Sequence, residues 1–246
     1  MEYTALVTGA DHGVGLALTV ALLKRGCRVF AGRYNAEEVA LEKLHQRFGD
    51  RLTLVPLDIG SDGSVREAAA AIKERTGRID ILINNAGILG DIEATIMDEL
   101  NYDEMLKVFN VNALGALRVT QALAPLVLNS TAKLIVNLSS EAGSIGQNRR
   151  DSWFAYCMSK AALNIQSSLV HNGLKKAGVQ VMILHPGWVQ TYMRGKLDAD
   201  AEWTPAQSAE NIIARIMERI GRNEENGLGI EEGPRFIDAK GKAMLW

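Results

Sequence analysis

Residues 8–15 read Thr8-Gly9-Ala10-Asp11-His12-Gly13-Val14-Gly15, and this stretch decides the fold. It follows a short apolar run, Ala5–Val7, and leads into a longer apolar run, Val14–Arg25. Glycines between a strand and a helix allow the backbone to turn sharply. They also let a pyrophosphate approach the main-chain N–H groups at the amino end of the helix. Three glycines alone could mark only a tight turn, but the strand before and the helix after them favour a dinucleotide-binding site.

Short apolar runs recur along the chain and are predicted to be buried strands. The first four begin about 25 residues apart, which leaves room for one helix and two short loops between them. Runs that are apolar on both faces and separated by helices are typical of a parallel sheet covered on both sides. The sequence therefore predicts an α/β fold with a doubly wound parallel sheet. The predicted strands are Ala5–Val7, Arg28–Ala31, Leu52–Val55, Ile79–Ile83, Lys133–Leu138, Val179–Leu184 and, more weakly, Pro234–Ile237.

Helices are predicted between these strands from their end signals. Ser64-x-x-Glu67 resembles a capping box at the start of an alanine-rich helix. Glycines follow other helices and are expected to end them. The further predicted helices span Val14–Arg25, Ala36–Phe48, about Asp98–Asn129 and about Ser152–Lys176.

Composition limits the possible classes of protein. The chain has 246 residues, of which 47% are hydrophobic and 23% charged, with a net charge of -2. That length suits one α/β domain spanning residues 1–246. Dispersed charge argues against a disordered chain and gives no support to nucleic-acid binding. No apolar run approaches about 18 residues, so no membrane span is expected. Because Met1–Gly9 lacks a basic region, we expect no signal peptide and a cytoplasmic protein. Cys27 and Cys157 lack the spacing of metal ligands, so no metal is expected.

The end of the second strand bears on the choice of cofactor. Folds that prefer NAD usually place an acidic side chain there, whereas this chain has Arg33. A guanidinium could form paired bonds to a 2′-phosphate, so we predict that NADP(H) is preferred over NAD(H). Arg33 could instead be a solvated loop residue. Asp58, after the third strand, could accept a hydrogen bond from an adenine amino group or form a turn ahead of Gly60.

Tyr156 and Lys160 are four residues apart within a predicted helix. This spacing is about one turn, so both side chains project from the same face. A free phenol has a pKa near 10, and a nearby cation favours its phenolate form. Such a pair is common by chance, so its meaning depends on its neighbours.

With those neighbours, the chain resembles the short-chain dehydrogenase/reductase family over nearly its whole length. Shorter strings, Gly143–Ile145, Ser159–Asn164 and His185–Thr191, resemble the subgroup of sniffer-type carbonyl reductases and C-factor-like proteins. The resemblance implies a Rossmann-type sheet of about seven strands in the order 3-2-1-4-5-6-7. The matching family motifs, in chain order, are Thr8–Gly15, Asn84–Gly87, Asn112, Ser140, the Tyr156 and Lys160 pair, and Pro186-Gly187 with Thr191.

The resemblance also implies hydride transfer between a nicotinamide and a ketone or aldehyde. The aromatic residues named below favour a small hydrophobic one. Tyr156 would protonate the carbonyl oxygen, and Ser140 would hydrogen-bond it, with Ser139 as the alternative serine. Lys160 would lower the pKa of Tyr156 and bind the nicotinamide ribose. Asn112 would hold a water that links Lys160 to solvent. The implied cofactor-binding residues are Gly9, His12, Gly13, Val14, Gly15, Arg33, Asp58, Asn85, Ala86, Gly87, Tyr156, Lys160, Pro186, Gly187, Val189 and Thr191.

Two loops, about 141–155 and 188–205, follow strands and are the candidate walls of a substrate pocket. Trp153, Phe154, Trp188 and Tyr192 could make that pocket apolar and partly aromatic. The alternative is that these aromatic side chains only pack the loops together.

Other functions remain open on sequence grounds. One is an NAD(P)-binding signalling protein of the C-factor type with vestigial catalysis, because fold does not fix function. A hydrolase built on Ser144 with His171 or His185 lacks the strand–serine–helix turn that it needs. The expected partners are a small carbonyl or alcohol substrate and a second copy of the chain, as a homodimer or homotetramer. Side chains that could form that contact, or face the sheet instead, are Leu117, Leu123, Leu126, Ile165 and Leu169.

Overall fold

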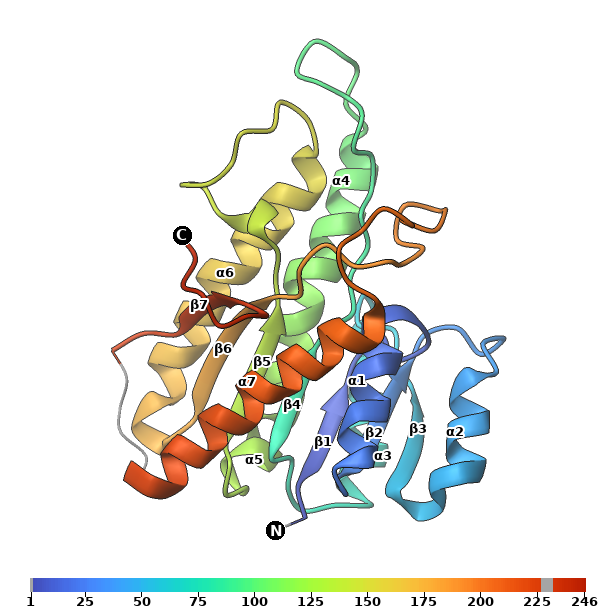
Figure 1. Cartoon of the computed structure of the whole chain (residues 1–246), viewed down its shortest axis with the longest axis vertical. Coiled ribbons are helices and arrows are strands. Elements are labelled where there is room, and N and C mark those ends of the chain that lie inside the picture. The colour runs from blue at the N-terminus through green and yellow to red at the C-terminus, as the bar shows by residue number, and fades with distance from the viewer. Residues whose placement is uncertain (1, 227–231) are drawn as a thin grey trace.

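One parallel sheet of seven strands organises the computed structural model, which describes residues 2–226 and 232–246 (Figure 1). The strand order is β3-β2-β1-β4-β5-β6-β7, and every neighbouring pair is parallel. Both the doubly wound α/β fold and the predicted strands are therefore confirmed. The strands are β1 (Thr4–Val7), β2 (Arg28–Arg33), β3 (Leu52–Pro56), β4 (Ile81–Asn84), β5 (Leu134–Leu138), β6 (Gln180–His185) and β7 (Arg235–Asp238).

Helices cover both faces of the sheet. On one face, α1 (Gly13–Lys24) packs against α7 (Pro205–Asn226), and α2 (Ala40–Phe48) lies beyond them (Figure 1). The other face carries α3 (Asp62–Lys73), α4 (Tyr102–Phe109), α5 (Ala116–Leu128) and α6 (Phe154–Leu174). The apolar core is correspondingly divided into two main clusters, one on each side of the sheet.

Strand β1 shows why the strands are apolar without a polar alternation. Ala5 and Val7 belong to one cluster, and Leu6 belongs to the other. Successive side chains of a strand point to opposite faces, and here both faces are buried. A run of consecutive apolar residues is therefore what this sheet requires.

The helical run over residues 102–128 is the longest apolar one. It joins α4 to α5 through a π-helical turn, Asn110–Gly115. By length and composition these 27 residues could cross a membrane, which corrects the expectation that no stretch approaches that length. Half of the most apolar window is buried inside the fold, and a core helix of this kind passes the same test. The run is therefore weak support for a membrane span.

Several helix starts differ from the predictions: the helix expected from about Asp98 begins at Tyr102, and α7 has no counterpart among the predicted helices. Helix α2 begins at Ala40 rather than Ala36. Helix α3 is capped by Ser61, whose Oγ accepts a hydrogen bond from the Ser64 N–H at 3.3 Å. Ser64 is thus the third helical residue, and its Oγ accepts instead from the Asp58 N–H at 2.9 Å. The predicted capping box was placed one turn too late because two serines three residues apart both suit an N-cap.

Candidate active site

The glycine loop between β1 and α1 is shaped by close backbone contacts. Gly9 has φ of +61°, a left-handed conformation that favours glycine. A Cβ on Gly15 would lie 2.0 Å from the Gly9 oxygen and 2.5 Å from Asn85 Nδ2, so no side chain fits there. The motif is therefore required by the backbone geometry.

Residues after β4 hold this loop in place. Asn85 Nδ2 donates to the main-chain oxygens of Thr8 and Gly9 at 2.8 and 3.0 Å. Thr8 Oγ1 in turn accepts from the N–H groups of Asn85 and Ala86. The structure thus places the predicted Asn85–Gly87 segment against the glycine loop.

Asp11 is a residue of the glycine loop with a structural role that the sequence analysis did not single out. Its buried carboxylate accepts hydrogen bonds from the N–H groups of Tyr34 and Asn35, at 3.0 and 3.3 Å. Asp11 therefore connects the glycine loop to the turn that follows β2. Only its place inside the motif, between the first two glycines, could have drawn attention to it.

The amino end of α1 fits a bound pyrophosphate. His12 occupies the N-cap position in an extended conformation, and its side chain makes no capping bond. The first N–H groups of a helix have no partner within the helix and favour an anion. Thr191 lies beside this end, because a Cβ on Gly13 would be 3.5 Å from Thr191 Cγ2. The loop after β6 thus reaches the loop after β1, as a dinucleotide site requires.

Trp203 packs back against the start of the loop that follows β6. Val189 forms an isolated parallel bridge with Trp203. Gly187 has φ of +86°, and a Cβ there would be 3.0 Å from the Trp203 ring. The predicted residues Pro186, Gly187 and Val189 therefore lie in a loop of defined shape at the carboxyl end of β6.

The two residues predicted to recognise the adenosine part have protein partners in this structure. The Arg33 guanidinium hydrogen-bonds the Glu42 carboxylate, so Arg33 is not a simple solvated residue. Asp58 Oδ1 accepts from the Gly60 N–H at 2.8 Å, which is the turn-forming role.

Ser140, Tyr156 and Lys160 come together at the carboxyl end of β5. All three residues are buried, and the Tyr156 phenol is hydrogen-bonded to the Ser140 side chain. Lys160 Nζ donates to the Leu138 oxygen at 2.8 Å and lies 5.6 Å from the centroid of the Tyr156 ring. The neighbouring Ser139 Oγ instead donates to Asn164 Oδ1 at 2.6 Å. Of the two serines, Ser140 is thus the one that faces the tyrosine.

Asn112 lies in the π-helical turn and joins two other segments. Its Nδ2 donates to the Ile88 oxygen at 2.8 Å and to Ser159 Oγ at 2.9 Å, and its Oδ1 accepts from the Ile88 N–H. This side chain therefore connects the loop after β4 to α6, a role that the sequence analysis did not predict.

Three buried side-chain hydrogen bonds fix α6 against the rest of the site. Ser159 bonds to Asn112, Asn164 bonds to Ser139, and Ser167 Oγ accepts from Asn137 Nδ2 at 2.7 Å. Asn164 Nδ2 also donates to the Gly143 oxygen at 3.1 Å. The helix that carries Tyr156 and Lys160 is thereby held by polar groups at three successive levels.

Burial dominates the acid–base properties of the tyrosine and lysine. It raises the pKa of Tyr156 to about 12, although the hydrogen bond from Ser140 acts in the opposite direction. It also lowers the pKa of Lys160 to about 8. Desolvation is the largest cause of the raised pKa of Tyr156, and Lys160 is not among the groups that shift it. That Lys160 lowers this pKa when a cofactor is bound stays a prediction.

Replacing Lys160 with methionine is expected to change how stability depends on pH. Between pH 8 and pH 10.5 the unfolded chain keeps the lysine proton and the native protein does not. The free energy of unfolding of the wild type therefore rises with pH in that window, by up to about 1.4 kcal/mol per pH unit. Lys160→Met should lose this contribution and be relatively most stabilised at neutral pH. Urea denaturation at pH 7.5 and pH 9.5 measures the difference.

The exposed Lys73 gives a matched control, because Lys73→Met removes a charge that solvent already screens. An unchanged pH dependence in Lys160→Met, relative to the wild type, would contradict the burial of a lysine with a lowered pKa.

Aromatic residues gather at the site only in part. Trp153 has φ of +66°, immediately before α6, and its ring meets Tyr156 edge-on with centroids 6.0 Å apart. Phe154 is the first residue of α6. Trp188 and Tyr192 are 51% and 67% exposed, and Trp188 Nε1 donates to Asp198 at 3.3 Å. The loop after β6 thus leaves two of the four aromatic residues largely exposed, and the aromatic substrate pocket stays a prediction.

A cavity of about 570 Å³ is lined in part by Glu141, the residue that follows Ser140. His185 is one of its walls, with a pKa lowered by burial, and its Nδ1 accepts from the Glu141 N–H at 3.4 Å. Arg150 bonds Glu141 at 2.6 Å and stacks 5.0 Å from the Trp153 ring. Ser144, the candidate nucleophile of a hydrolase, accepts instead from the Gln147 N–H in a loop turn. The lining also includes Arg149, Asp238 and Lys242.

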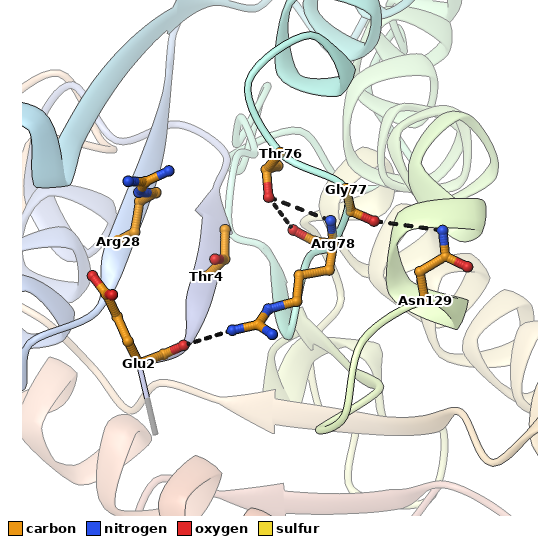
Figure 2. Close-up of a pocket in the computed structure, with 7 residues that line it drawn as sticks. All are labelled: Glu2, Thr4, Arg28, Thr76, Gly77, Arg78 and Asn129. Carbon is orange, nitrogen blue, oxygen red and sulfur yellow. Dashed lines mark hydrogen bonds between the residues drawn. The ribbon is translucent and has the colours of Figure 1, made fainter.

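A second cavity, of about 460 Å³, lies at the opposite edge of the sheet (Figure 2). It is formed around the amino ends of β1 and β2, where Arg78 donates to the Glu2 oxygen and Thr76 Oγ1 donates to the Arg78 oxygen. Ligands of open α/β sheets bind at the carboxyl ends of the strands. None of the residues that line this cavity belongs to the glycine loop or to the group formed by Ser140, Tyr156 and Lys160.

Comparison with known proteins decides the family. Residues 3–202 match the family model for short chain dehydrogenases. This chain is a short-chain dehydrogenase. The C-signal protein of Myxococcus xanthus is 36% identical over 171 residues, which are 70% of this short-chain dehydrogenase and 95% of the relative. Relatives of this family are named as dehydrogenases and reductases, and this member is likewise an oxidoreductase that acts on CH–OH or C=O groups.

Solved structures give the same family. The NADPH-bound carbonyl reductase from chicken fatty liver has a TM-score of 0.85 and 30% identity to this short-chain dehydrogenase, and each chain is covered completely. The carbonyl reductase Sniffer of D. melanogaster has a TM-score of 0.87 and 26% identity, again over all of both chains. These similarities confirm the predicted family.

Proposed function

We propose that this short-chain dehydrogenase is an NADP(H)-dependent carbonyl reductase that acts on small hydrophobic ketones and aldehydes. One observation carries the proposal: a Tyr156 phenol hydrogen-bonded to Ser140, with Lys160 buried one turn along the same helix. This group lies at the same edge of the sheet as the glycine loop. This arrangement supports Tyr156 as the proton donor to a carbonyl that meets a bound nicotinamide.

Each of the four residues has a proposed role. A bound nicotinamide supplies or accepts the hydride. Tyr156 donates its proton to the carbonyl oxygen, and the raised pKa keeps it protonated for that step at neutral pH. Ser140 hydrogen-bonds the same oxygen and positions it. Lys160 binds the nicotinamide ribose and returns the proton to Tyr156, and Asn112 holds the water that connects Lys160 to solvent.

Cofactor contacts follow from the loops already described. The pyrophosphate is proposed to lie over the glycine loop, and the nicotinamide over the loop after β6, with Thr191 at its carboxamide. Bound NADP or NADPH is named for several similar structures. Together with Arg33 at the end of β2, this supports a preference for NADP(H) over NAD(H). The remaining proposed contacts are Gly9, His12, Gly13, Val14, Gly15, Asp58, Asn85, Ala86, Gly87, Pro186, Gly187 and Val189.

The first experiment measures NADPH oxidation by the purified protein against a panel of ketones, aldehydes and quinones. We expect turnover with carbonyl compounds that have apolar bodies, and none with charged keto acids. NADPH binding without turnover on any compound would overturn the reductase and favour a signalling protein, as the similarity to C-signal suggests. Direct fluorescence titration of NADPH distinguishes that outcome from a failure to bind.

We also propose that residues 1–246 act as one catalytic domain in the cytoplasm, without a nucleic-acid or membrane partner. The chain is proposed to form a homodimer or homotetramer through the outer faces of α5 and α6. Ile165 and Leu169 are 61% and 65% exposed on α6, and Leu117 is partly exposed on α5. Leu123 and Leu126 are buried, so these two face the interior and not a partner.

Ile165→Asp combined with Leu169→Asp is expected to give a monomer, because two charges would be buried in the contact. Light scattering after size-exclusion chromatography measures the mass. A wild type that is already monomeric, or an unchanged assembly in the variant, would contradict this contact.

A further inference from the structure

The turn after β2 is held from two sides by acidic residues. Asp11 of the glycine loop accepts hydrogen bonds from the main chain of Tyr34 and Asn35. Glu42 of α2 bonds to the guanidinium of Arg33. In a dinucleotide site of this fold, the adenosine ribose lies at this end of β2. Two carboxylates therefore border the place where a 2′-phosphate would lie.

The two acidic residues have different contacts with Arg33. The Asp11 carboxylate accepts hydrogen bonds from main-chain N–H groups and fixes the shape of the turn, without bonding the guanidinium. Glu42 instead bonds the cation itself through Oε1, while its Oε2 is buried and has no hydrogen-bond partner in the part of the chain that the structure describes. The Arg33 side chain is only 19% exposed, so water screens this pair incompletely.

A phosphate and a carboxylate at one guanidinium are in competition. The guanidinium of arginine has five N–H donors and no acceptor. A phosphate and a carboxylate both form paired hydrogen bonds with these same donors. A 2′-phosphate must therefore share Arg33 with Glu42 or displace it, and the two negative charges repel at short range. A 2′-hydroxyl carries no charge and meets no such repulsion.

We propose that Glu42 is a specificity-determining residue that weakens the binding of a 2′-phosphate by Arg33. The preference for NADP(H) over NAD(H) is therefore smaller than Arg33 alone would give. The inference rests on the proposed function, because it takes Arg33 as the group that binds the phosphate. Glu42 sets how strongly that group acts and has no part in hydride transfer.

The experiment measures binding of 2′,5′-ADP and of 5′-ADP to the full chain by titration calorimetry. These probes differ by the 2′-phosphate and need no turnover. Glu42→Gln keeps the size of the side chain and removes its charge. We expect the Kd for 2′,5′-ADP to fall by roughly threefold to tenfold, and the Kd for 5′-ADP to stay within about twofold. The gain should shrink as the salt concentration rises.

Three variants complete the design. Glu37→Gln removes an exposed charge from the same segment and should leave both Kd values unchanged. Arg33→Ala should weaken 2′,5′-ADP selectively. In the double variant with Arg33→Ala, Glu42→Gln should have lost its effect, since the two residues act through one contact.

The outcomes distinguish the role of Glu42 from the proposed binding of a 2′-phosphate by Arg33. If Arg33→Ala weakens 2′,5′-ADP but Glu42→Gln leaves it unchanged or weakens it, then Glu42 supports the arginine and the inference is overturned while Arg33 keeps its role. If Arg33→Ala has no effect on either probe, the proposed recognition of the 2′-phosphate is itself wrong. Binding of 5′-ADP reports an intact site in every variant.

Discussion

Tyr156→Phe is expected to lower kcat for carbonyl reduction by about 10²-fold to 10⁴-fold, the contribution of a positioned general acid. Phenylalanine keeps the ring that meets Trp153 edge-on and removes only the hydroxyl that bonds Ser140. The loss should therefore appear in kcat, with the NADPH Kd within about threefold of the wild type. Steady-state NADPH oxidation, combined with fluorescence titration of NADPH, separates the two quantities.

Tyr102→Phe is the matched control, because the Tyr102 side chain is exposed at the start of α4. It should behave like the wild type. A Tyr156→Phe enzyme that retains most of its kcat would show that another group protonates the product, and it would remove Tyr156 from the mechanism.

Gly15→Ala is expected to disrupt the dinucleotide site more than any other single methyl group added to the chain. The added Cβ would lie 2.0 Å from the main-chain oxygen of Gly9 and 2.5 Å from Asn85 Nδ2. Neither atom can move away freely, because the first belongs to the backbone and the second is hydrogen-bonded to it. Overpacking of this kind costs about 1–3 kcal/mol, and displacement of the loop would also separate the N–H groups that face a pyrophosphate. We expect lower stability in urea and at least about a tenfold weaker NADPH affinity.

Gly173→Ala controls for helix propensity. Gly173 also lies in a helix, α6, and a Cβ there would meet nothing within 4 Å. That variant should be neutral or up to about 1 kcal/mol more stable, because alanine is the better helix former. Wild-type stability and affinity in Gly15→Ala would contradict the steric account of the motif.

The sequence was most informative where local patterns have a single physical explanation. Strands buried on both faces have to be apolar throughout, so all seven strands could be predicted from apolar runs, whereas α7 was not predicted. Ser140 and Tyr156 could be named from their motifs, but the choice between Ser139 and Ser140 needed the structure. Neighbouring residues at a strand end point in different directions. The hydrogen bond from Ser139 to Asn164 shows that Ser139 points away from Tyr156, and this contact could not be predicted from the motif.

Contacts between distant segments could not be predicted from spacing. Glu42 meets Arg33 because α2 folds back over the end of β2, and Asp11 meets Tyr34 because β1 and β2 are neighbours in the sheet. The pKa of Tyr156 depends on how deeply α6 is packed, which no motif encodes. The exposure of Trp188 and Tyr192 likewise depends on how Trp203 closes their loop.

The three polar bonds that hold α6 also connect catalysis to the folding equilibrium. Opening this helix away from the sheet would leave its serine and asparagine groups, and their partners, buried without hydrogen bonds or would require water to enter the core. Local opening of α6 is then nearly as costly as global unfolding, so its amides should be among the slowest to exchange with solvent. Partly unfolded forms that keep the outer helices would lack a working Tyr156. On gradual heating, activity should therefore be lost together with the cooperative transition of the whole sheet, with no inactive native-like state before it.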